Sequence, residues 1–194
     1  MKIVGLTGGI GSGKTTVAKF FSEFKNVAIY IADVEAKKLM NSSEIIKTKL
    51  VKVFGEESFI KGELNRTFIA EIVFKDKEKL AILNGIVHPE VRKHFQKFIE
   101  NNQDKVYIIY ENAILFESKS NIFCDIVITV YADLNTKINR VIARDSSTKT
   151  AVLSRMKSQW SDAKKMLQSN YIIYNEKLED TVNQVHKIHN ILTQ

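Results

Sequence analysis

Five short apolar runs are spaced along the chain, and all are rich in valine, isoleucine or tyrosine. They span residues 3–7, 27–31, 106–110, 126–130 and 171–174. None of the runs alternates cleanly between apolar and polar positions, a pattern typical of strands that are buried on both faces of a parallel sheet. The pattern therefore predicts a five-stranded parallel sheet flanked by helices.

Between these runs, apolar residues recur at the three- and four-residue spacing of amphipathic helices. Val17, Phe20 and Phe24 share one such stripe, and similar stripes predict helices at residues 14–24, 90–101 and 178–192. Pro89 stands where a first-turn proline is tolerated. Strands that alternate with helices indicate an α/β fold with right-handed crossovers.

The stretch between the second and third predicted strands is too long for a single crossover connection. It contains further helical patterns at residues 45–54, 66–75 and 77–87. We therefore predict a single domain whose core comprises about 1–35, 104–136 and 168–194, with a helical insertion at about 36–103.

Composition is that of an ordinary globular protein and excludes several classes. Of the 194 residues, 44% are hydrophobic and 26% are charged, which argues against a disordered or collagen-like chain. No apolar run approaches the ~20 residues needed to span a bilayer. The single cysteine, Cys124, allows no intrachain disulfide, and we expect a cytoplasmic protein.

The net charge is +7, and much of it lies in residues 137–165. This basic segment could serve a nucleic acid, a membrane surface or a polyphosphate ligand, and composition does not choose between them. Its basic residues are Lys137, Arg140, Arg144, Lys149, Arg155, Lys157, Lys164 and Lys165. We expect Lys164 and Lys165 at the surface. Trp160, in the same segment, could stack on a base or pack the segment onto the core, and we expect packing.

A glycine cluster near the N-terminus fits the phosphate-loop pattern G-x-x-x-x-G-K-[ST]. Glycines let successive backbone N–H groups form an anion-binding nest, to which the following helix adds its N-terminal N–H groups. Lys14 can reach the β- and γ-phosphates of ATP, and the Thr15 hydroxyl can hold Mg²⁺. The predicted nucleotide-binding residues are Gly8, Gly9, Gly11, Ser12, Gly13, Lys14, Thr15 and Thr16.

The loop indicates a P-loop NTPase, and the chain lacks the N-K-x-D and D-x-x-G motifs of a GTPase. A small chain of this kind is most like a small-molecule kinase, whose helical insertion holds the acceptor and whose basic segment closes as a lid, here residues 137–167. Arg140 and Arg144 share a helix face and would point at the phosphates. A nucleic-acid-binding P-loop protein and an ATP-binding adaptor remain alternatives.

Two acids follow predicted strands and are candidates for a base or a metal ligand. Asp33 and Glu111 lie at carboxyl ends of strands, beside the expected phosphate loop. The structural alternatives are a helix N-cap for Asp33 and a solvated turn for Glu111. His88, which precedes Pro89, is expected to be extended at a helix start, where it contacts a substrate phosphate or caps the helix.

The chain resembles the dephospho-CoA kinases in motifs that run in order from residue 3 to residue 175. Thr7-Gly8-Gly9-Ile10-Gly11-Ser12-Gly13-Lys14 is more specific than a generic phosphate loop, and Ile31-Ala32-Asp33 ends in the family's acceptor-side acid. The other matches are Leu64-Asn65-Arg66, Val87-His88-Pro89, Leu115-Phe116-Glu117, Arg140, Arg144-Asp145, Gln159 and Asn175. Ala113 and Asn170 depart from the pattern, where a proline and an acid are usual.

The resemblance implies ATP-dependent phosphorylation of the 3′-hydroxyl of dephospho-CoA. A nucleoside or nucleotide kinase of the same architecture is the alternative. The implied catalytic residues are Lys14, Asp33 and Arg140; Arg144 and Asn175 would contact ATP, and Thr7, Asp33, Arg66, His88 and Glu117 the acceptor. The expected cofactors are ATP and Mg²⁺. We expect a monomer or weak homo-oligomer with a small-molecule substrate and neither nucleic acid nor membrane as partner.

Overall fold

The computed structural model describes residues 1–194, which form two compact units. The sheet unit comprises Met1–Ile31 and Asn102–Gln194, and the helical unit comprises Ala32–Asn101. The sheet unit is therefore built from two separate stretches of chain, and the helical unit is one continuous stretch between them. None of the helices is both long and apolar enough to cross a membrane.

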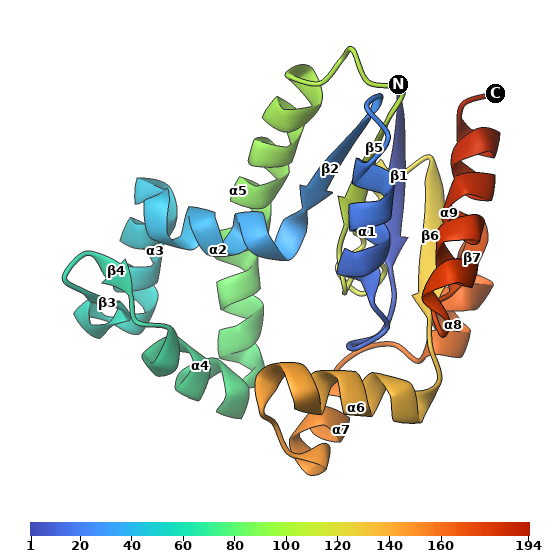
Figure 1. Cartoon of the computed structure of the whole chain (residues 1–194). Helices are drawn as coiled ribbons and strands as arrows, with labels where there is room; N and C mark the ends of the chain where they lie inside the picture. The colour runs from blue at the N-terminus through green and yellow to red at the C-terminus, as the bar shows by residue number, and fades with distance from the viewer. The chain divides into compact units, whose positions relative to one another are not determined.

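The sheet unit contains a five-stranded parallel sheet in the order β2-β5-β1-β6-β7 (Figure 1). The prediction of five parallel strands is confirmed, with every strand within one residue of its expected bounds. The strands are β1 (Lys2–Thr7), β2 (Val27–Ile31), β5 (Tyr107–Glu111), β6 (Ile126–Tyr131) and β7 (Tyr171–Tyr174).

Helices α1 (Lys14–Ser22) and α9 (Leu178–Leu192) pack against the sheet and against each other (Figure 1). Val17 and Phe21 of α1 join Val185 and Leu192 of α9 and the strand side chains in one buried cluster. This cluster explains why the strands read as unbroken apolar runs, since their side chains are buried instead of alternating with solvent.

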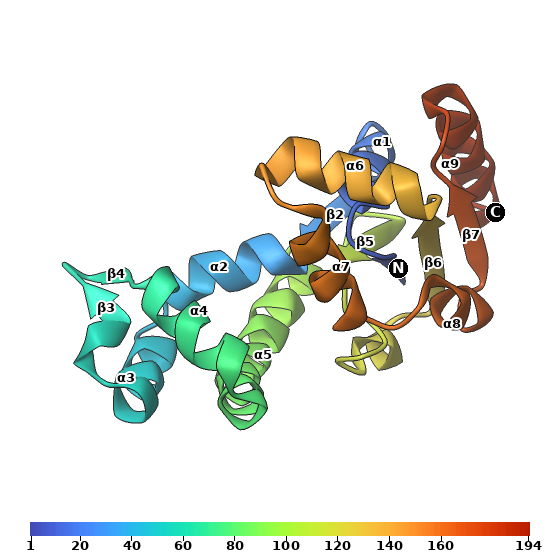
Figure 2. The same ribbon diagram turned by 90° about the horizontal axis from the view of Figure 1, so that it is seen from below.

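Three further helices of the sheet unit carry most of the basic segment. They are α6 (Leu134–Asp145), α7 (Lys149–Lys157) and α8 (Asp162–Leu167). Helices α6 and α7 lie side by side (Figure 2) and bury Ile138, Val141 and Val152 in a small cluster against Ile10 of the phosphate loop. The segment expected to act as a lid therefore packs against that loop.

The helical unit is organised around one long helix, α5, which contacts α2, α3 and α4. Buried side chains of α5 include Ile86, Val91 and Phe95, and Leu50 and Ile69 come from neighbouring helices. The elements are α2 (Ala32–Ser42), α3 (Glu44–Phe54), η1 (Glu56–Ser58), β3 (Phe59–Ile60), β4 (Glu63–Leu64), α4 (Arg66–Lys75) and α5 (Lys77–Glu100).

The prediction of separate helices at 77–87 and 90–101 is wrong, because α5 runs through Pro89 without a break. Pro89 removes one backbone donor and disfavours helix in the preceding residue, but burial of Val87 and Val91 on either side outweighs that cost. His88 is consequently helical, and the expectation of an extended His88 at a helix start is also wrong.

A small antiparallel hairpin, β3–β4, was not expected from the sequence. Lys61 and Gly62 both have positive φ, 52° and 86°, as a tight two-residue hairpin turn requires. Strands of two residues carry too little hydrophobic pattern to be distinguished from a loop.

Candidate active site

The phosphate loop connects the end of β1 to the start of α1. Gly11 and Gly13 have φ of 81° and 90°, in the left-handed region that disfavours other residues. A Cβ at Gly11 would run into the carbonyl oxygen of Lys137, and one at Gly13 would run into the side-chain amide of Asn175. The loop is thus closely surrounded, and its glycines are required by both conformation and space.

Lys14, the first residue of α1, is buried and its ammonium group lies over the loop. Its Nζ donates to the carbonyl oxygens of Gly8 and Gly9, at 3.1 and 3.3 Å. The Ser12 and Thr7 side chains are fully buried, and their hydroxyl groups have no hydrogen-bond partner. The lysine is therefore at the position where a phosphate held by the loop would need a cation.

Thr15 and Glu111 bring two oxygen donors together beside the loop. The Thr15 hydroxyl donates to Oε1 of Glu111 at 3.3 Å, and Glu111 is buried at the last position of β5, opposite Leu6 of β1. Because neighbouring parallel strands end at the same edge, the carboxylate of β5 reaches the helix that follows β1. Glu111 is thus part of a strand and not of the solvated turn that was its structural alternative.

Asn175 holds the backbone of the phosphate loop through its side-chain amide. Its Nδ2 donates to the Ser12 carbonyl at 2.8 Å, and its Oδ1 accepts from the Thr181 hydroxyl at 3.0 Å. With only 2% of its surface exposed, the side-chain amide is used inside the protein on the loop backbone. The structure therefore brings Asn175 to the phosphate loop.

The two arginines expected to act together have different surroundings. The Nη1 atom of Arg140 is buried without a hydrogen-bond partner, 3.7 Å from where a Cβ of Gly13 would lie. Arg144 instead forms a two-bond fork with Asp145, at 2.7 and 3.0 Å. Asp145 also pairs with Arg155 at 2.9 Å, and Arg144, followed by Arg155, holds the pKa of Asp145 well below its usual range.

An ion pair between Lys137 and Asp162 lies against Gly9 and was missed in the sequence. A Cβ on Gly9 would be 2.8 Å from Oδ1 of Asp162 and 3.4 Å from Nζ of Lys137. Nearby, Oε1 of Gln159 accepts a hydrogen bond from the Ile10 amide at 2.9 Å. These partners are far apart in sequence, and no local spacing relates them.

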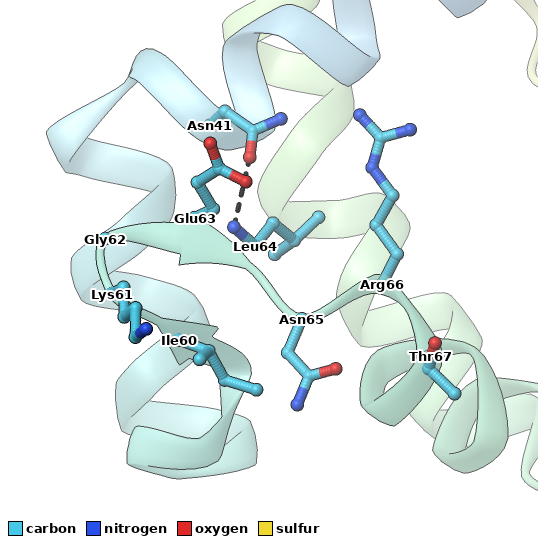
Figure 3. A pocket seen from close by; sticks show the side chains of 9 residues that line it. All are labelled: Asn41, Ile60, Lys61, Gly62, Glu63, Leu64, Asn65, Arg66 and Thr67. Carbon is cyan, nitrogen blue, oxygen red and sulfur yellow. Dashed lines mark hydrogen bonds between the residues drawn. The ribbon is translucent and has the colours of Figure 1, made fainter.

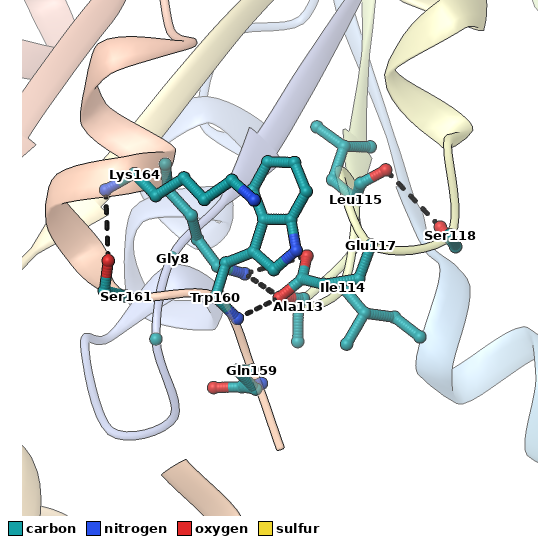
Figure 4. A network of polar contacts seen from close by, with 12 residues as sticks. Gly8, Ala113, Ile114, Leu115, Glu117, Ser118, Gln159, Trp160, Ser161 and Lys164 are labelled. Carbon is teal, nitrogen blue, oxygen red and sulfur yellow. Dashed lines mark hydrogen bonds and ion pairs between the residues drawn. The ribbon is translucent and has the colours of Figure 1, made fainter. Parts of the chain in front are cut away.

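Glu117 forms a second network with Lys165 and Trp160, and Figure 4 shows Glu117 beside Trp160. The Lys165 side chain is fully buried, so the expectation that it lies at the surface is wrong. Its Nζ is 2.9 Å from Oε1 of Glu117 and 2.6 Å from the Ala113 carbonyl oxygen. The Trp160 ring stacks on Phe116, which agrees with the expected packing role of the tryptophan.

The helical unit contains the remaining expected site residues, which are Asp33, Arg66 and His88. Asp33 is the second residue of α2 and exposed, two residues after β2 ends, so it is not an N-cap. Arg66 opens α4 after the N-cap Asn65, and it is exposed. His88 is half-buried, and burial, together with the charge of Arg92, lowers its pKa.

Beside the hairpin of the helical unit is a hollow of about 900 Å³ that includes Arg66 (Figure 3). Asn41 stabilises its wall, because its Oδ1 accepts from the backbone amide of Leu64 at 3.0 Å. The lining residues are Asn41, Ile60, Lys61, Gly62, Glu63, Leu64, Asn65, Arg66 and Thr67.

Comparison with known proteins is consistent across sequence and structure. A family model described as dephospho-CoA kinase matches residues 2–180. The dephospho-CoA kinase of Fusobacterium nucleatum is 37% identical over 187 residues, covering 95% of each chain. That of Bacteroides fragilis is 34% identical over 182 residues, covering 94% of this chain and 88% of the relative.

Solved structures give the same fold. TT1252 from Thermus thermophilus superposes with a TM-score of 0.85 and 26% identity, covering 100% of this chain and 98% of that chain. A dephospho-CoA kinase from Campylobacter jejuni has a TM-score of 0.64 at 22% identity, covering 98% and 97% of the two chains. A shikimate kinase from Bacteroides thetaiotaomicron, with a TM-score of 0.56 at 13% identity over 100% and 99% of the two chains, shares the fold alone.

Proposed function

This chain belongs to the dephospho-CoA kinase family, and from that premise we propose which of its residues carry the reaction. The reaction is ATP-dependent phosphorylation of the 3′-hydroxyl of dephospho-CoA, which gives CoA and ADP in coenzyme A biosynthesis. The observation that carries the residue assignment is the phosphate loop between β1 and α1, with Lys14 and Arg140 beside it.

The phosphate donor is held by the loop and by two cations. Backbone N–H groups of the loop and of the first turn of α1 bind the β- and γ-phosphates, since a glycine-rich turn that leads into a helix N-terminus forms an anion-binding nest. Lys14 neutralises their oxygen charge, and Arg140 stabilises the charge that spreads over the transferring phosphoryl group. The buried, unpartnered Nη1 of Arg140 next to Gly13 supports this role.

Thr15 and Glu111 fit Mg²⁺, because both supply hard oxygen donors and their oxygens are 3.3 Å apart. We propose that the Thr15 hydroxyl binds the ion and that Glu111 orients the hydroxyl or a water molecule beside it. When bound, the ion neutralises charge on the phosphates. The chain's own contribution is a pair of oxygens, one in the first turn of α1 and one at the end of β5.

The acceptor hydroxyl is activated by Asp33. The 3′-oxygen attacks the γ-phosphorus, the bond from that phosphorus to the β–γ bridging oxygen breaks, and the hydroxyl proton passes to the Asp33 carboxylate. Arg66 and His88 hold the acceptor, and the hollow beside Arg66 supplies room for part of it. Because its pKa is lowered, His88 takes part as a neutral hydrogen-bonding group.

The remaining expected contacts with ATP and with the acceptor are revised because of the surroundings of each residue. Arg144 reaches ATP only by leaving Asp145, whereas Asn175 acts on ATP through the loop backbone that it holds. No acceptor contact is proposed for Thr7 because its side chain is fully buried. None is proposed for Glu117, whose carboxylate oxygens have Lys165 and Trp160 as partners.

We also propose a cytoplasmic protein that acts as a monomer or weak homo-oligomer, without nucleic acid. The single cysteine suits a reducing compartment. Four of the eight basic side chains of residues 137–165 are paired, since Lys137 and Lys165 form buried ion pairs and Arg144 and Arg155 share Asp145 at the surface. This pairing leaves half of the basic side chains for a continuous phosphate-binding stripe of the kind nucleic acids need, which argues against such a partner.

An acceptor panel tests the substrate. The purified protein is incubated with ATP and Mg²⁺ and with dephospho-CoA, adenosine, AMP, dTMP or CMP in parallel, and ADP release is measured. We expect turnover with dephospho-CoA alone. Turnover with a nucleotide in place of dephospho-CoA would keep the kinase chemistry and discard the acceptor assignment.

A further inference from the structure

Residues 159–165 comprise the end of the connection from α7 to α8 and the first four residues of α8, and they contact the phosphate loop and the segment after β5. At one end, the amide oxygen of Gln159 accepts a hydrogen bond from the Ile10 N–H at 2.9 Å. Ile10 lies inside the phosphate loop, so a side chain from the lid segment holds the loop backbone directly. Neither the proposed catalytic roles nor the phosphate-loop motif accounts for this contact.

At the other end, Lys165 is fully buried and its ammonium group is surrounded by oxygen. Nζ lies 2.9 Å from Oε1 of Glu117, 3.3 Å from Oε2, and 2.6 Å from the carbonyl oxygen of Ala113. A buried lysine is stable only when such partners compensate for its lost hydration. Lys165 therefore fixes Glu117 and the backbone at Ala113 relative to α8.

Glu117 links the ion pair to the residue next to Gln159. Its Oε1 also accepts the backbone N–H of Trp160 at 2.8 Å (Figure 4). The Trp160 ring stacks on Phe116, with centroids 5.8 Å apart and planes 5° apart, and Nζ of Lys164 lies 3.4 Å from the ring centroid. Both the backbone and the ring of Trp160 are thus immobilised, which limits where Gln159 can reach.

We propose that the Lys165–Glu117 pair positions Gln159, and through it the Ile10 N–H, so that the phosphate loop is preorganised for ATP. Lys165 and Glu117 are positioning residues in this assignment, which rests on the proposed function of the loop. Glu117 then acts on the donor side of the reaction and has no direct contact with the acceptor. Preorganisation of this kind improves affinity by reducing the ordering cost of binding.

A thermodynamic cycle with three variants tests the connection. Gln159→Ala removes the contact with Ile10 and leaves the ion pair intact. Lys165→Met with Glu117→Met removes the pair, and replacing both members of a buried pair by apolar residues is often tolerated by the fold. The third variant combines all three substitutions, and Lys157→Met is the control, because Lys157 is an exposed lysine at the end of α7.

Two readouts need no acceptor: the Kd of ATP by calorimetry and the amide resonance of Ile10. We expect Gln159→Ala and the double variant each to weaken ATP binding about three- to tenfold, as for the loss of one hydrogen bond. The triple variant should bind ATP no more weakly than the weaker of the other two variants, because the effects of residues that act through one another do not add. Both changes should shift the Ile10 amide resonance in the same direction, and Lys157→Met should shift neither readout.

The proposal would be overturned if the loss of ATP affinity in the triple variant equalled the sum of the losses in the other two variants. It would also be overturned if the Ile10 amide resonance did not shift when the ion pair is removed. A rise in the KM for dephospho-CoA with unchanged ATP affinity would overturn it as well, and would return Glu117 to the acceptor. Glu117→Gln keeps the side-chain volume and supplies a second measurement should the double variant not fold, and it too must move the Ile10 resonance. A wild-type protein that binds ATP but does not phosphorylate dephospho-CoA would refute the proposed function alone, since the cycle uses ATP only.

Discussion

The carboxylate of Asp33 is the group to which we assign the acceptor proton, and it is exposed in the first turn of α2. We expect Asp33→Asn to lower kcat by about a hundredfold or more, the usual size of a general-base effect. The Kd of ATP should change little because the phosphate loop is untouched. Steady-state kinetics and calorimetric ATP binding measure the two quantities.

Glu35→Gln is the matched control for Asp33, since Glu35 lies in the same first turn and pairs with Lys38 at 2.8 Å. Its turnover should stay near that of the wild type. Equal losses of kcat and ATP affinity in Asp33→Asn would contradict the assignment of a base and indicate a structural role for the carboxylate.

Single residues differ in how far their roles could be predicted from the sequence. Lys14 could be assigned because its neighbours in the loop are also its neighbours in the chain. Lys165 could not, because its burial depends on Glu117, 48 residues earlier, and the adjacent Lys164 remains exposed. The identity of a charged residue does not reveal its partner, so Lys165 was expected at the surface together with Lys164.

At the scale of elements, α5 makes a prediction about stability. Pro89 interrupts the hydrogen-bond ladder of a continuous helix. Pro89→Ala restores a donor toward the Gly85 carbonyl and should raise the free energy of unfolding by about 1–2 kcal/mol, after subtraction of the greater freedom of the unfolded chain. Urea denaturation followed by circular dichroism measures the change. A lower free energy of unfolding in the variant would show that the neighbouring helices pack against the shape that α5 adopts with Pro89 in place.

Elements with a clear local apolar pattern, unbroken in the strands and one-sided in the helices, were predicted well, and those governed by distant contacts were not. The five strands and α9 follow from their sequences because burial on the sheet selects their residues directly. The continuity of α5 through Pro89 does not follow from the sequence, because proline locally disfavours a helix. The helix continues because the apolar side chains of α5 on either side of Pro89 are buried. The short hairpin at 59–64 depends on two turn residues with positive φ.

At the scale of the molecule, stability should decrease as the pH falls below about 6.5. Burial, and then the nearby charge of His186, lowers the pKa of His189, and burial with Arg92 lowers that of His88. At a pH of about 6 the two histidines therefore bind protons more readily in the unfolded chain than in the folded chain. Unfolding is favoured as the pH falls through the pKa of the histidines in the unfolded chain. His189 accepts or donates at 2.7 Å to the Tyr107 hydroxyl and stacks on Phe24, contacts that keep the neutral ring in place.

Thermal unfolding at pH 7.5 and 5.5 checks this dependence, with His189→Gln as the comparison. Glutamine can hydrogen-bond to Tyr107 but does not titrate, so the variant should lose less Tm between the two pH values than the wild type. Carboxylate titration contributes about equally to both proteins and cancels in the difference. Identical pH dependence of the two proteins would exclude His189 as a source.

The bond between Asn175 and the carbonyl of Ser12 spans 163 residues and sets an order of events during synthesis. The phosphate loop leaves the ribosome well before Asn175, which holds its backbone, and before Thr181, which holds the Asn175 side chain. A nascent chain that ends before β7 consequently has the complete motif without its support. We expect stalled chains of this length to bind ATP poorly, so that nucleotide affinity appears only once β7 and the start of α9 have been made.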